Sequence, residues 1–367
     1  MNLKIMFTGG GTAGHVTPNI ALIALFKNEG WEIFYIGSGL GIEKEMILGE
    51  NIPFYSISSG KLRRYFSIKN FLDPLKILLG IVQSTYFFYK LKPDVLFSKG
   101  GFVAFPVVVG AWLNQIKIIA HESDMSPGLA NRLSYPFIDK ICVPYEDSRK
   151  YFKKQDKIEV TGTPIRQQLF QGSMAKGLQL CGFDTSLPCL LVIGGSLGAN
   201  SINHSVREAL SQLLQGFQVI HLCGKGKIAP HLIAQKGYCQ LEYAKEELAD
   251  LFAAASVVIS RAGANSLYEI LALAKPHVLI PLSARVSRGD QIQNSQYFKK
   301  AGISVVIEDE SLNAQTLIEA LDEVLQNKND IIAKMKALNL ESASEKIVKL
   351  IKGQVKASLA LNHENSL

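Results

Sequence analysis

Short runs of aliphatic and β-branched residues alternate with longer stretches in which apolar residues recur every three or four positions. This alternation is typical of α/β proteins, in which helices cover both faces of a parallel sheet. Residues 199–214 show the helical period most clearly, with one apolar stripe made of Ile202, Val206, Ala209, Leu210, Leu213 and Leu214. The pattern predicts strands at Leu3–Thr8, Ile33–Ile36, Phe54–Ile57, Val95–Ser98, Lys117–Ala120, Lys140–Val143 and Ile158–Thr161 in the first half, and at Leu190–Ile193, Gln218–Leu222, Cys239–Leu241, Val257–Ser260, His277–Ile280 and Ser304–Ile307 in the second.

The two halves of the chain begin alike, with a strand followed by a glycine-rich turn. The turns read GGGTAGH at residues 9–15 and GGSLGAN at residues 194–200. A repeated strand, glycine turn and helix predicts two tandem Rossmann-like, doubly wound domains. We expect these domains at residues 1–163 and 164–340. A helix at residues 341–352 is expected to pack back on the first domain, with residues 353–367 as a flexible tail.

Composition narrows the class of protein. Of the 367 residues, 47% are hydrophobic and 19% are charged, so the chain is too apolar to be disordered and too long for a single core. The formal net charge of +7 suggests an acidic partner such as a phosphate ligand, nucleic acid or an anionic membrane surface. We expect no nucleic acid partner, because no helix-turn-helix, zinc-finger or RNA-binding signature accompanies the charge.

The cysteines and the apolar runs indicate a reduced, intracellular protein without a membrane span. The five cysteines include no C-x-x-C pair, which argues against a disulfide framework or a zinc site. The N-terminus runs directly into glycines and has no signal-peptide core. Residues 77–89 are too short to cross a bilayer, and residues 100–116 and 185–206 are interrupted by glycine, proline or polar residues.

The two glycine turns are candidate phosphate sites. Glycines after a strand let the backbone approach a phosphate closely, and the following helix presents free N–H groups. Thr12 and Ser196 each add a hydroxyl. A tight turn with no ligand is the alternative, because neither turn is a clear dinucleotide fingerprint or a G-K-[ST] phosphate loop. The glycines concerned are Gly10, Gly11, Gly194, Gly195 and Gly198.

Two residues at strand ends are candidates for acid–base chemistry. His15 follows the first glycine turn at the start of a helix, whose positive end favours a neutral imidazole that can accept a proton. Glu122 follows the strand Lys117–Ala120 and is expected to face the same crevice. For His15 the alternative is a helix-terminal histidine with no task.

Four further residues, all near predicted strand ends or the domain join, are candidate ligand contacts. Arg261 is placed to neutralise phosphate, and Glu269 to accept two ribose hydroxyls. Gln291, beside Asp290 in a polar loop, is a candidate to bind sugar hydroxyls. Arg166 follows the join and is placed to contact a ligand held between the domains. An exposed helix charge for Glu269 and a solvated loop for Gln291 are the alternatives.

Residues 61–92 combine an apolar helix with basic residues. Asp73-Pro74 is expected to begin the helix. One apolar face is expected to be buried: Leu75, Leu78, Leu79, Val82, Tyr86 and Tyr89. A second stripe would then face outward and, ringed by positive charge, lie on an anionic membrane; it comprises Ile77, Ile81 and Phe88, with Lys69 and Lys76 among the basic residues. A helix buried on both sides, or a dimer contact, is the alternative.

Taken together, these motifs resemble the MurG family of peptidoglycan N-acetylglucosaminyltransferases. The shared motifs are GGGTAGHVTP at residues 9–18, HESDMSPGLAN at 121–131, TGTPIR at 161–166, GGSLGA at 194–199 and SRAG at 260–263, in the order of the family. The resemblance spans about residues 1–350. In one departure, many members read His-Glu-Gln-Asn where this chain has HESD, so that Asp124 stands in place of a sugar-contacting asparagine.

The resemblance implies a GT-B fold with the active site in the cleft between two Rossmann-like domains. It implies transfer of N-acetylglucosamine from UDP-N-acetylglucosamine to lipid I (undecaprenyl-pyrophosphoryl-MurNAc-pentapeptide), with inversion and a β-1,4 link in the product, lipid II. No metal or other cofactor is expected. The family's histidine matches His15, and its basic-ringed apolar patch matches residues 61–92. Positions that match the family's donor-binding residues are Thr12, Ala13, Gly14, Asp124, Arg166, Ser196, Glu269 and Gln291.

The residues and the resemblance combine into one mechanistic hypothesis. The C-terminal domain holds UDP, and the N-terminal domain holds the acceptor diphosphate at its glycine turn. His15, with Glu122, removes the proton of the acceptor 4-hydroxyl, while Arg261 and helix dipoles stabilise the departing UDP. Domain closure brings the two substrates together.

The same hypothesis places the chain at the cytoplasmic face of the bacterial membrane as a peripheral protein. It allows for partner proteins in wall synthesis, which the sequence does not identify. Three alternatives stay open: a diacylglycerol glycosyltransferase, a UDP-N-acetylglucosamine 2-epimerase, and a non-catalytic nucleotide-sugar-binding subunit.

Overall fold

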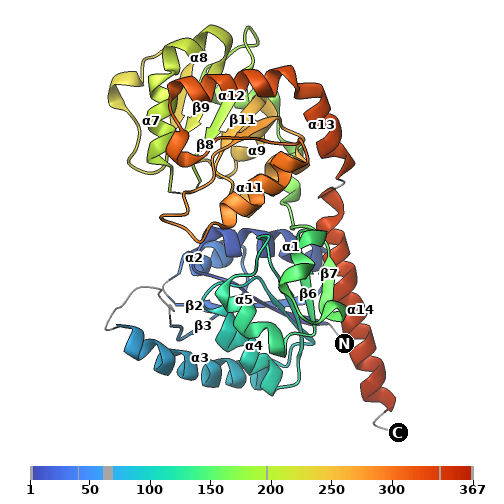
Figure 1. Cartoon of the computed structure of the whole chain (residues 1–367). Coiled ribbons are helices and arrows are strands. Elements are labelled where there is room, and N and C mark those ends of the chain that lie inside the picture. The colour runs from blue at the N-terminus through green and yellow to red at the C-terminus, as the bar shows by residue number, and fades with distance from the viewer. Residues whose placement is uncertain (1–2, 40, 61–68, 196, 339, 365–367) are drawn as a thin grey trace. The chain divides into compact units, whose positions relative to one another are not determined.

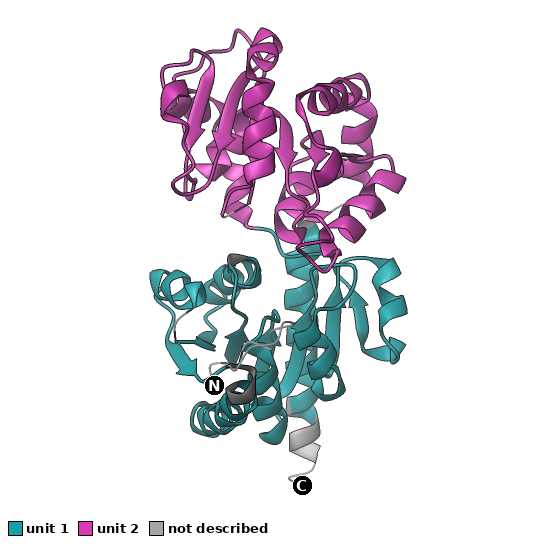
Figure 2. Cartoon of the chain, turned by 60° about the vertical axis from the view of Figure 1, so that its left-hand side comes forward, with its two compact units in different colours: residues 1–165, 342–367 teal, residues 166–341 magenta. Residues whose placement is uncertain are grey.

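The computed structural model describes residues 3–39, 41–60, 69–195, 197–338 and 340–364. It divides into two compact units, shown in Figure 2: unit 1 comprises residues 1–165 and 342–367, and unit 2 comprises residues 166–341. The chain passes from unit 1 to unit 2 between Ile165 and Arg166, close to the join expected from the sequence.

Unit 1 is built on a seven-stranded parallel sheet in the order β3-β2-β1-β4-β5-β6-β7 (Figure 1). Its strands are β1 (Lys4–Thr8), β2 (Glu32–Ser38), β3 (Phe54–Ile57), β4 (Val95–Ser98), β5 (Lys117–His121), β6 (Lys140–Val143) and β7 (Ile158–Val160). Its α-helices are α1 (Thr17–Asn28), α2 (Ile42–Gly49), α3 (Lys69–Leu91), α4 (Ala104–Leu113), α5 (Leu129–Ser134) and α14 (Ala343–Glu364). Short 3₁₀ helices are η1 (Ala13–His15), η2 (Tyr135–Phe137), η3 (Glu146–Tyr151) and η4 (Gln155–Lys157).

Unit 2 repeats the arrangement with six parallel strands in the order β10-β9-β8-β11-β12-β13. These are β8 (Cys189–Ile193), β9 (Gln218–Leu222), β10 (Tyr238–Leu241), β11 (Ala255–Ser260), β12 (His277–Leu279) and β13 (Val305–Val306). The α-helices are α6 (Met174–Cys181), α7 (Asn200–Glu208), α8 (Leu210–Gly216), α9 (Leu248–Ala254), α10 (Ala264–Ala272), α11 (Asp290–Lys300), α12 (Ala314–Gln326) and α13 (Lys328–Ala337). The 3₁₀ helices are η5 (Gln167–Gln171), η6 (Pro230–Leu232), η7 (Asp309–Ser311) and η8 (Leu340–Ser342), the last at the return to unit 1.

All of the predicted strands are confirmed, as is the fold of two doubly wound domains. Burial on both faces of the sheets explains why the strands read as continuous apolar runs. In β1, Ile5 and Phe7 enter one core cluster while Met6, between them, enters the cluster on the opposite face. The predicted stripe of residues 199–214 is buried as expected except for Leu214, which is half-buried, and the helix is broken at Ala209, which separates α7 from α8.

The C-terminal segment is helical beyond the point where a flexible tail was expected. Helix α14 continues through Gly353 to Glu364. Ile351 and Val355, one turn apart on either side of Gly353, are both buried in a core cluster of unit 1, so the helix is held on both sides of the glycine. The expectation of a frayed segment directly after residue 352 was therefore wrong.

Helix α3 is turned the other way from the expected orientation. Phe88 is buried, at 1% exposure, and Ile77 and Ile81 are half-buried. The stripe expected inside is instead exposed, each side chain by more than half: Leu75, Leu78, Leu79, Val82, Tyr86 and Tyr89. The helix also includes Asp73 and Pro74, so these residues do not begin it.

Small residues explain this orientation. Gly80 and Ser84 lie one turn apart on α3 and face α4, where the Ser84 hydroxyl donates to the Pro106 carbonyl at 2.8 Å. A Cβ added at Gly110 of α4 would overlap the Ser84 hydroxyl, and one at Gly80 would overlap the Ser58 carbonyl. Close packing is thus available only on the Gly80–Ser84–Phe88 side, and the larger apolar stripe is left outside.

No helix in the described ranges is long and apolar enough to cross a membrane. The exposed apolar face of α3 lies on the surface of unit 1 as part of a helix that packs along α4.

Two helix glycines, the packed Gly80 of α3 and the exposed Gly353 of α14, allow a direct stability test. We expect Gly80→Ala to lower the free energy of unfolding by about 1–3 kcal/mol, because its methyl group must displace backbone. The matched variant Gly353→Ala, where nothing lies within 4 Å of an added Cβ, should stabilise α14 by about 0.5–1 kcal/mol. Urea unfolding measures both; equal effects at the two sites would contradict the packing described for α3.

Candidate active site

The first glycine turn is packed against a second one that the sequence interpretation did not single out. Gly100 and Gly101 follow β4, both with φ of +85°, and a Cβ at Gly101 would overlap the Gly10 carbonyl. The Gly10 amide donates to the Gly100 carbonyl at 3.4 Å. The Gly-Gly pair directly after a predicted strand was the available signal for this contact.

A buried carboxylate already binds the first glycine turn. Glu43, at the start of α2, is fully buried and accepts hydrogen bonds from the amide of Gly11 at 3.2 Å and from the amide and hydroxyl of Ser38. The Gly11 amide is therefore not an open phosphate donor in this conformation. Thr12 beside it is exposed, and Gly14 is half-buried. Sequence reasoning missed Glu43, because a glutamate in the first turn of a helix is ordinary.

His15 is held by a backbone carbonyl. Its Nδ1 lies 3.1 Å from the Lys99 carbonyl oxygen, which can only accept a hydrogen bond. In the neutral ring the proton is therefore on Nδ1, and Nε2 carries the lone pair that can accept a proton. The side chain is half-buried at the carboxyl edge of the unit 1 sheet.

Glu122 is part of the loop architecture and does not fit the role of a base. One carboxylate oxygen accepts from the amides of Ser123 (2.9 Å) and Asp124 (3.1 Å), and the other from the Gly128 amide (2.8 Å) and the Asn131 side chain (3.0 Å). The side chain is 5% exposed. A carboxylate whose oxygens are each engaged by two donors holds its loop in place. The structure therefore argues against the predicted catalytic role of Glu122.

The preceding residue, His121, is also structural. It is fully buried, and its Nε2 donates to the Gly162 carbonyl at 2.8 Å. Burial, reinforced by the nearby Lys99 charge, lowers the pKa of His121 well below its ordinary value. The ring is neutral and ties β5 to the end of β7.

The second glycine turn, in unit 2, leads to a helix without a side-chain cap. Gly195 (φ +86°) has open space around an added Cβ, whereas a Cβ at Gly194 or Gly198 would overlap the neighbouring backbone. Helix α7 begins at Asn200, and its N-cap residue Ala199 offers no capping side chain. Within the described residues no side chain of the N-cap binds the first amides of α7, and such helix starts are suited to an anion. Ser196, a predicted phosphate contact, lies outside the described residues.

The structure brings together two predicted site residues, Arg166 and Glu269. The Nε and Nη2 atoms of Arg166 both lie 2.9 Å from Oε1 of Glu269. Burial raises the pKa of Glu269, and the Arg166 charge opposes that rise. Among the described residues no other hydrogen bond involves this carboxylate, so Oε2 can accept from a ligand.

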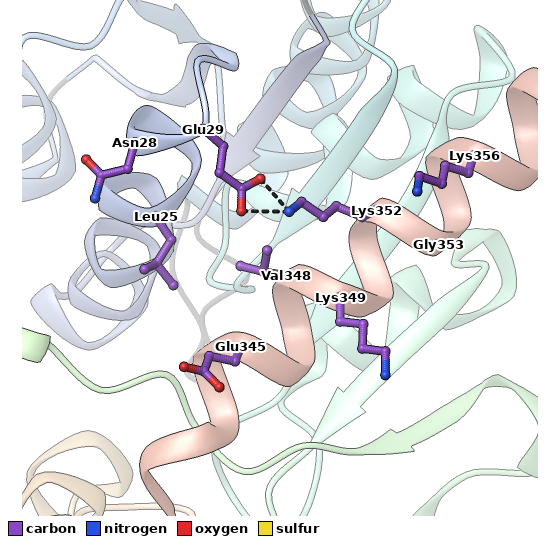
Figure 3. A pocket seen from close by; sticks show the side chains of 9 residues that line it. All are labelled: Leu25, Asn28, Glu29, Glu345, Val348, Lys349, Lys352, Gly353 and Lys356. Atoms are coloured by element: carbon purple, nitrogen blue, oxygen red, sulfur yellow. Dashed lines mark hydrogen bonds and ion pairs between the residues drawn. The ribbon is translucent and has the colours of Figure 1, made fainter.

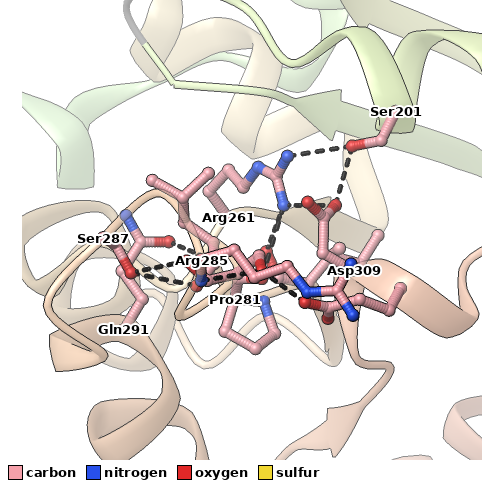
Figure 4. Close-up of polar contacts among 11 residues, drawn as sticks. Ser201, Arg261, Pro281, Arg285, Ser287, Gln291 and Asp309 are labelled. Atoms are coloured by element: carbon pink, nitrogen blue, oxygen red, sulfur yellow. Dashed lines mark hydrogen bonds and ion pairs between the residues drawn. The ribbon is translucent and has the colours of Figure 1, made fainter.

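Arg261 is paired within unit 2, as Figure 4 shows. Its guanidinium donates to Asp309 at 2.7 Å, to the Ser201 hydroxyl at 2.9 Å, and to the carbonyls of Ile280 and Pro281. The ion pair is mostly buried, with side-chain exposures of 11% and 17%. Asp309 thus balances the Arg261 charge within the fold, and the role of Arg261 as a phosphate ligand stays a prediction.

The side-chain amide oxygen of Gln291 is bound by the backbone of unit 2. Its Oε1 accepts from the Leu282 amide at 3.0 Å (Figure 4), which leaves Nε2 as the donor end. A Cβ added at Gly263, just before α10, would lie 3.8 Å from that Nε2. Gln291 and the start of α10 are therefore neighbours at the carboxyl edge of the unit 2 sheet.

A separate groove of about 660 Å³ lies between α1 and α14 of unit 1 (Figure 3). It is spanned by an ion pair between Glu29 and Lys352 at 2.6 Å. None of the predicted site residues lines it. The described parts of the chain also contain no cluster of three or more histidine, cysteine or acidic residues that could bind a metal, and their five cysteines are free.

The comparisons with known proteins agree with this architecture. Residues 5–143 match the N-terminal domain of glycosyltransferase family 28, and residues 189–351 match its C-terminal domain. A Legionella pneumophila (strain Lens) protein named UDP-N-acetylglucosamine–N-acetylmuramyl-(pentapeptide) pyrophosphoryl-undecaprenol N-acetylglucosamine transferase is 69% identical over 354 residues, 96% of this chain and 98% of the relative. The chain belongs to this MurG family.

Solved structures share the fold. The crystal structure of Acinetobacter baumannii MurG superimposes with a TM-score of 0.75 at 22% identity, covering 96% of this chain and 99% of that one. A UDP-GlcNAc 2-epimerase from Neisseria meningitidis, bound to UDP-GlcNAc, superimposes with a TM-score of 0.65 at 16% identity, covering 96% and 100%. At these identities the likeness concerns the fold, which family 28 shares with other sugar-nucleotide enzymes.

The Arg261–Asp309 pair predicts a stability defect. We expect Arg261→Met to lower the free energy of unfolding by about 3 kcal/mol, because it leaves Asp309 mostly buried without its partner. The exposed Arg285, replaced in the same way, should change it by less than about 0.5 kcal/mol. Urea unfolding checks both; an Arg261→Met protein as stable as the unmodified chain would contradict the dependence of Asp309 on this pairing.

Proposed function

We propose that the chain transfers N-acetylglucosamine from UDP-N-acetylglucosamine to lipid I, forming lipid II for peptidoglycan and thereby serving cell-wall growth, cell shape and division. The observation that carries this proposal is the 69% identity, over nearly the whole of both chains, to an enzyme named for that reaction. The paired match to both domains of family 28 supports a two-domain glycosyltransferase.

The donor is held by unit 2 in this proposal. Oε2 of Glu269, the oxygen not bound by Arg166, accepts the ribose hydroxyls. The uncapped start of α7 binds the diphosphate, and Nε2 of Gln291 donates to the donor. The positive end of α7 also stabilises the negative charge that develops on departing UDP, so the reaction as proposed needs no metal.

In this proposal the general base for the acceptor hydroxyl is His15 of unit 1. Nε2 of His15 takes the proton of the acceptor 4-hydroxyl, as the hydroxyl oxygen forms its bond to the anomeric carbon. The bond from that carbon to the diphosphate oxygen breaks, and UDP leaves with the electron pair. Attack from the side opposite the leaving group inverts the anomeric centre and produces a β link. The Lys99 carbonyl keeps the ring in the tautomer that this step requires.

The exposed face of α3 is the proposed membrane contact. Six apolar side chains, each more than half exposed, form one face of a helix that also carries the exposed Lys76 and Lys90. Apolar contact with acyl chains and attraction to anionic headgroups together favour such a face lying on lipid. The proposed contact is therefore the exposed stripe of α3 and not the predicted residues Ile77, Ile81 and Phe88, which are buried or half-buried. The side chain of Lys69, also predicted, lies outside the described residues. We infer a peripheral protein on the cytoplasmic face of the cell membrane, where lipid I is used.

One assay separates this function from its alternatives. Purified protein is incubated with labelled UDP-N-acetylglucosamine and, in parallel, lipid I, diacylglycerol or no acceptor. We expect label in lipid II alone. Label transferred only to diacylglycerol, or epimerised donor without acceptor, would identify the corresponding alternative, and donor binding without any product would identify a non-catalytic subunit.

His15 should matter for turnover more than for donor binding. We expect His15→Ala to lower kcat by about 100-fold or more, because general-base catalysis is lost, while the KM for donor changes less than about 2-fold. The matched control is His231→Ala, an exposed histidine of η6, which should behave like the unmodified enzyme. Turnover that survives in His15→Ala would refute the base assignment.

Membrane binding should depend on the outer stripe of α3. We expect Leu79→Glu combined with Val82→Glu to reduce binding to phosphatidylglycerol-containing vesicles by about 10-fold or more, and salt to weaken binding of the unmodified protein. Ile233→Glu changes an equally exposed apolar residue of unit 2 and should bind normally. Sedimentation with vesicles measures this, and unchanged binding of the α3 variant would exclude this face.

A further inference from the structure

The side chain of Lys99, at the carboxyl edge of the unit 1 sheet, has no role in the mechanism above, which uses only the carbonyl of this residue. Lys99 follows β4 and is 2% exposed. Its ammonium donates to the Ser123 hydroxyl, and no ion pair within the described ranges includes it. Removing an ammonium from water costs several kcal/mol unless hydrogen bonds and nearby negative charge offset the loss. The structure therefore requires a source of negative charge close to Lys99.

Two carboxylates of one loop supply that charge. Burial lowers the pKa of Lys99 to about 8, and the charges of Glu122 and then Asp124 act against this lowering. Glu122 is committed to the amides and side chain of its own loop. Asp124 is half-buried and directly follows Ser123, whose hydroxyl accepts the hydrogen bond from the Lys99 ammonium.

This arrangement accounts for the departure noted in the sequence. Where many MurG proteins carry Gln-Asn, this chain carries Ser123-Asp124, which exchanges a neutral amide for a charged carboxylate. The serine hydroxyl accepts a hydrogen bond from the Lys99 ammonium, and Asp124 brings a negative charge to the same loop.

Lys99 also touches the predicted base through its backbone. Its amide donates to the Thr8 carbonyl at 2.8 Å, and its carbonyl holds Nδ1 of His15. One residue thus connects the first glycine turn, the base and the loop that carries Asp124. Its ammonium can influence the reaction by fixing that loop, although it is too buried to touch substrate directly.

We propose that Lys99 is a positioning residue for sugar transfer: its ammonium holds the loop at residues 122–124 through Ser123 and balances the carboxylate of Asp124, so that the two charges work as a pair. The transfer readout rests on the proposed function. The pairing itself concerns only this chain's residues.

The test is a double-mutant cycle on the full-length protein. Lys99→Met, Asp124→Asn and the double variant are compared for kcat, for KM of each substrate and for urea unfolding. We expect Lys99→Met to lower kcat by about 10-fold or more, and the double variant to recover at least about 5-fold of that loss, because removing the partner charge relieves an unbalanced carboxylate. Lys117→Met is the matched control: this lysine lies at the opposite end of the same sheet, paired with Asp139, and should leave kcat unchanged.

The dependence of kcat on pH distinguishes a positioning role of Lys99 from a purely structural one, because a purely structural lysine would not change it. Besides Ser123, the groups that interact electrostatically with Lys99 are Glu122 and Asp124 of the loop after β5, His121 at the end of β5, and Cys142 of β6. The ammonium is present below about pH 8 and is lost above it, so kcat of the unmodified enzyme should fall as pH rises through about 8. The double variant, which carries neither charge, should lack this alkaline decline.

Independent effects of Lys99→Met and Asp124→Asn, both in kcat and in unfolding free energy, would overturn the pairing. If Lys99→Met does not fold, Ser123→Ala removes the acceptor while keeping the ammonium; unchanged kcat and an unchanged alkaline limb in that variant would equally overturn the proposal. If the unmodified chain transfers no sugar to lipid I, the proposed function fails instead, and coupling between the two positions in urea unfolding still tests the pairing.

Discussion

The candidate site in unit 1 depends on how closely two backbone turns approach each other. Gly10 and Gly101 are in contact at the ends of β1 and β4, where a Cβ on Gly101 would overlap the Gly10 carbonyl. No side chain separates these turns, so Lys99, directly before Gly100, can reach three neighbours. It binds β1 through its amide, His15 through its carbonyl and Ser123 through its ammonium. A larger residue in either turn would separate the base from the loop beside it.

The charged residues at the two sheet edges differ chiefly in how completely the protein itself binds them. Glu43, Glu122 and Arg261 have their polar atoms engaged by amides, hydroxyls or an opposite charge, and each organises a turn or loop. Glu269 differs, because Arg166 binds only one of its oxygens. In a poorly solvated site a group already bound by the fold has little left for substrate, so the remaining atoms of Glu269 and Gln291 are the proposed donor contacts.

Helix α3 illustrates how packing decides which side of a helix with two apolar stripes is buried. Both of its stripes are hydrophobic, and apolar area alone would favour burying the larger one. The helix instead buries Gly80, Ser84 and Phe88, because only the small residues allow α4 to approach. The remaining stripe of leucine, valine and tyrosine stays at the surface and gives unit 1 its proposed lipid contact.

The sequence by itself determined the strands, the two-domain organisation and the family, since these follow from local periodicity, repeated glycine turns and ordered motifs. It also identified Arg166 and Glu269 as site candidates, and the structure places them in contact. The tertiary structure alone decided which face of α3 is buried, how far α14 extends, and which charges are free. These outcomes depend on contacts between residues distant in the chain, such as Arg261 with Asp309 and Lys99 with Ser123. Every candidate charge near a strand end looks alike in sequence, and only its three-dimensional partners distinguish a residue that holds the fold from one that can meet a ligand.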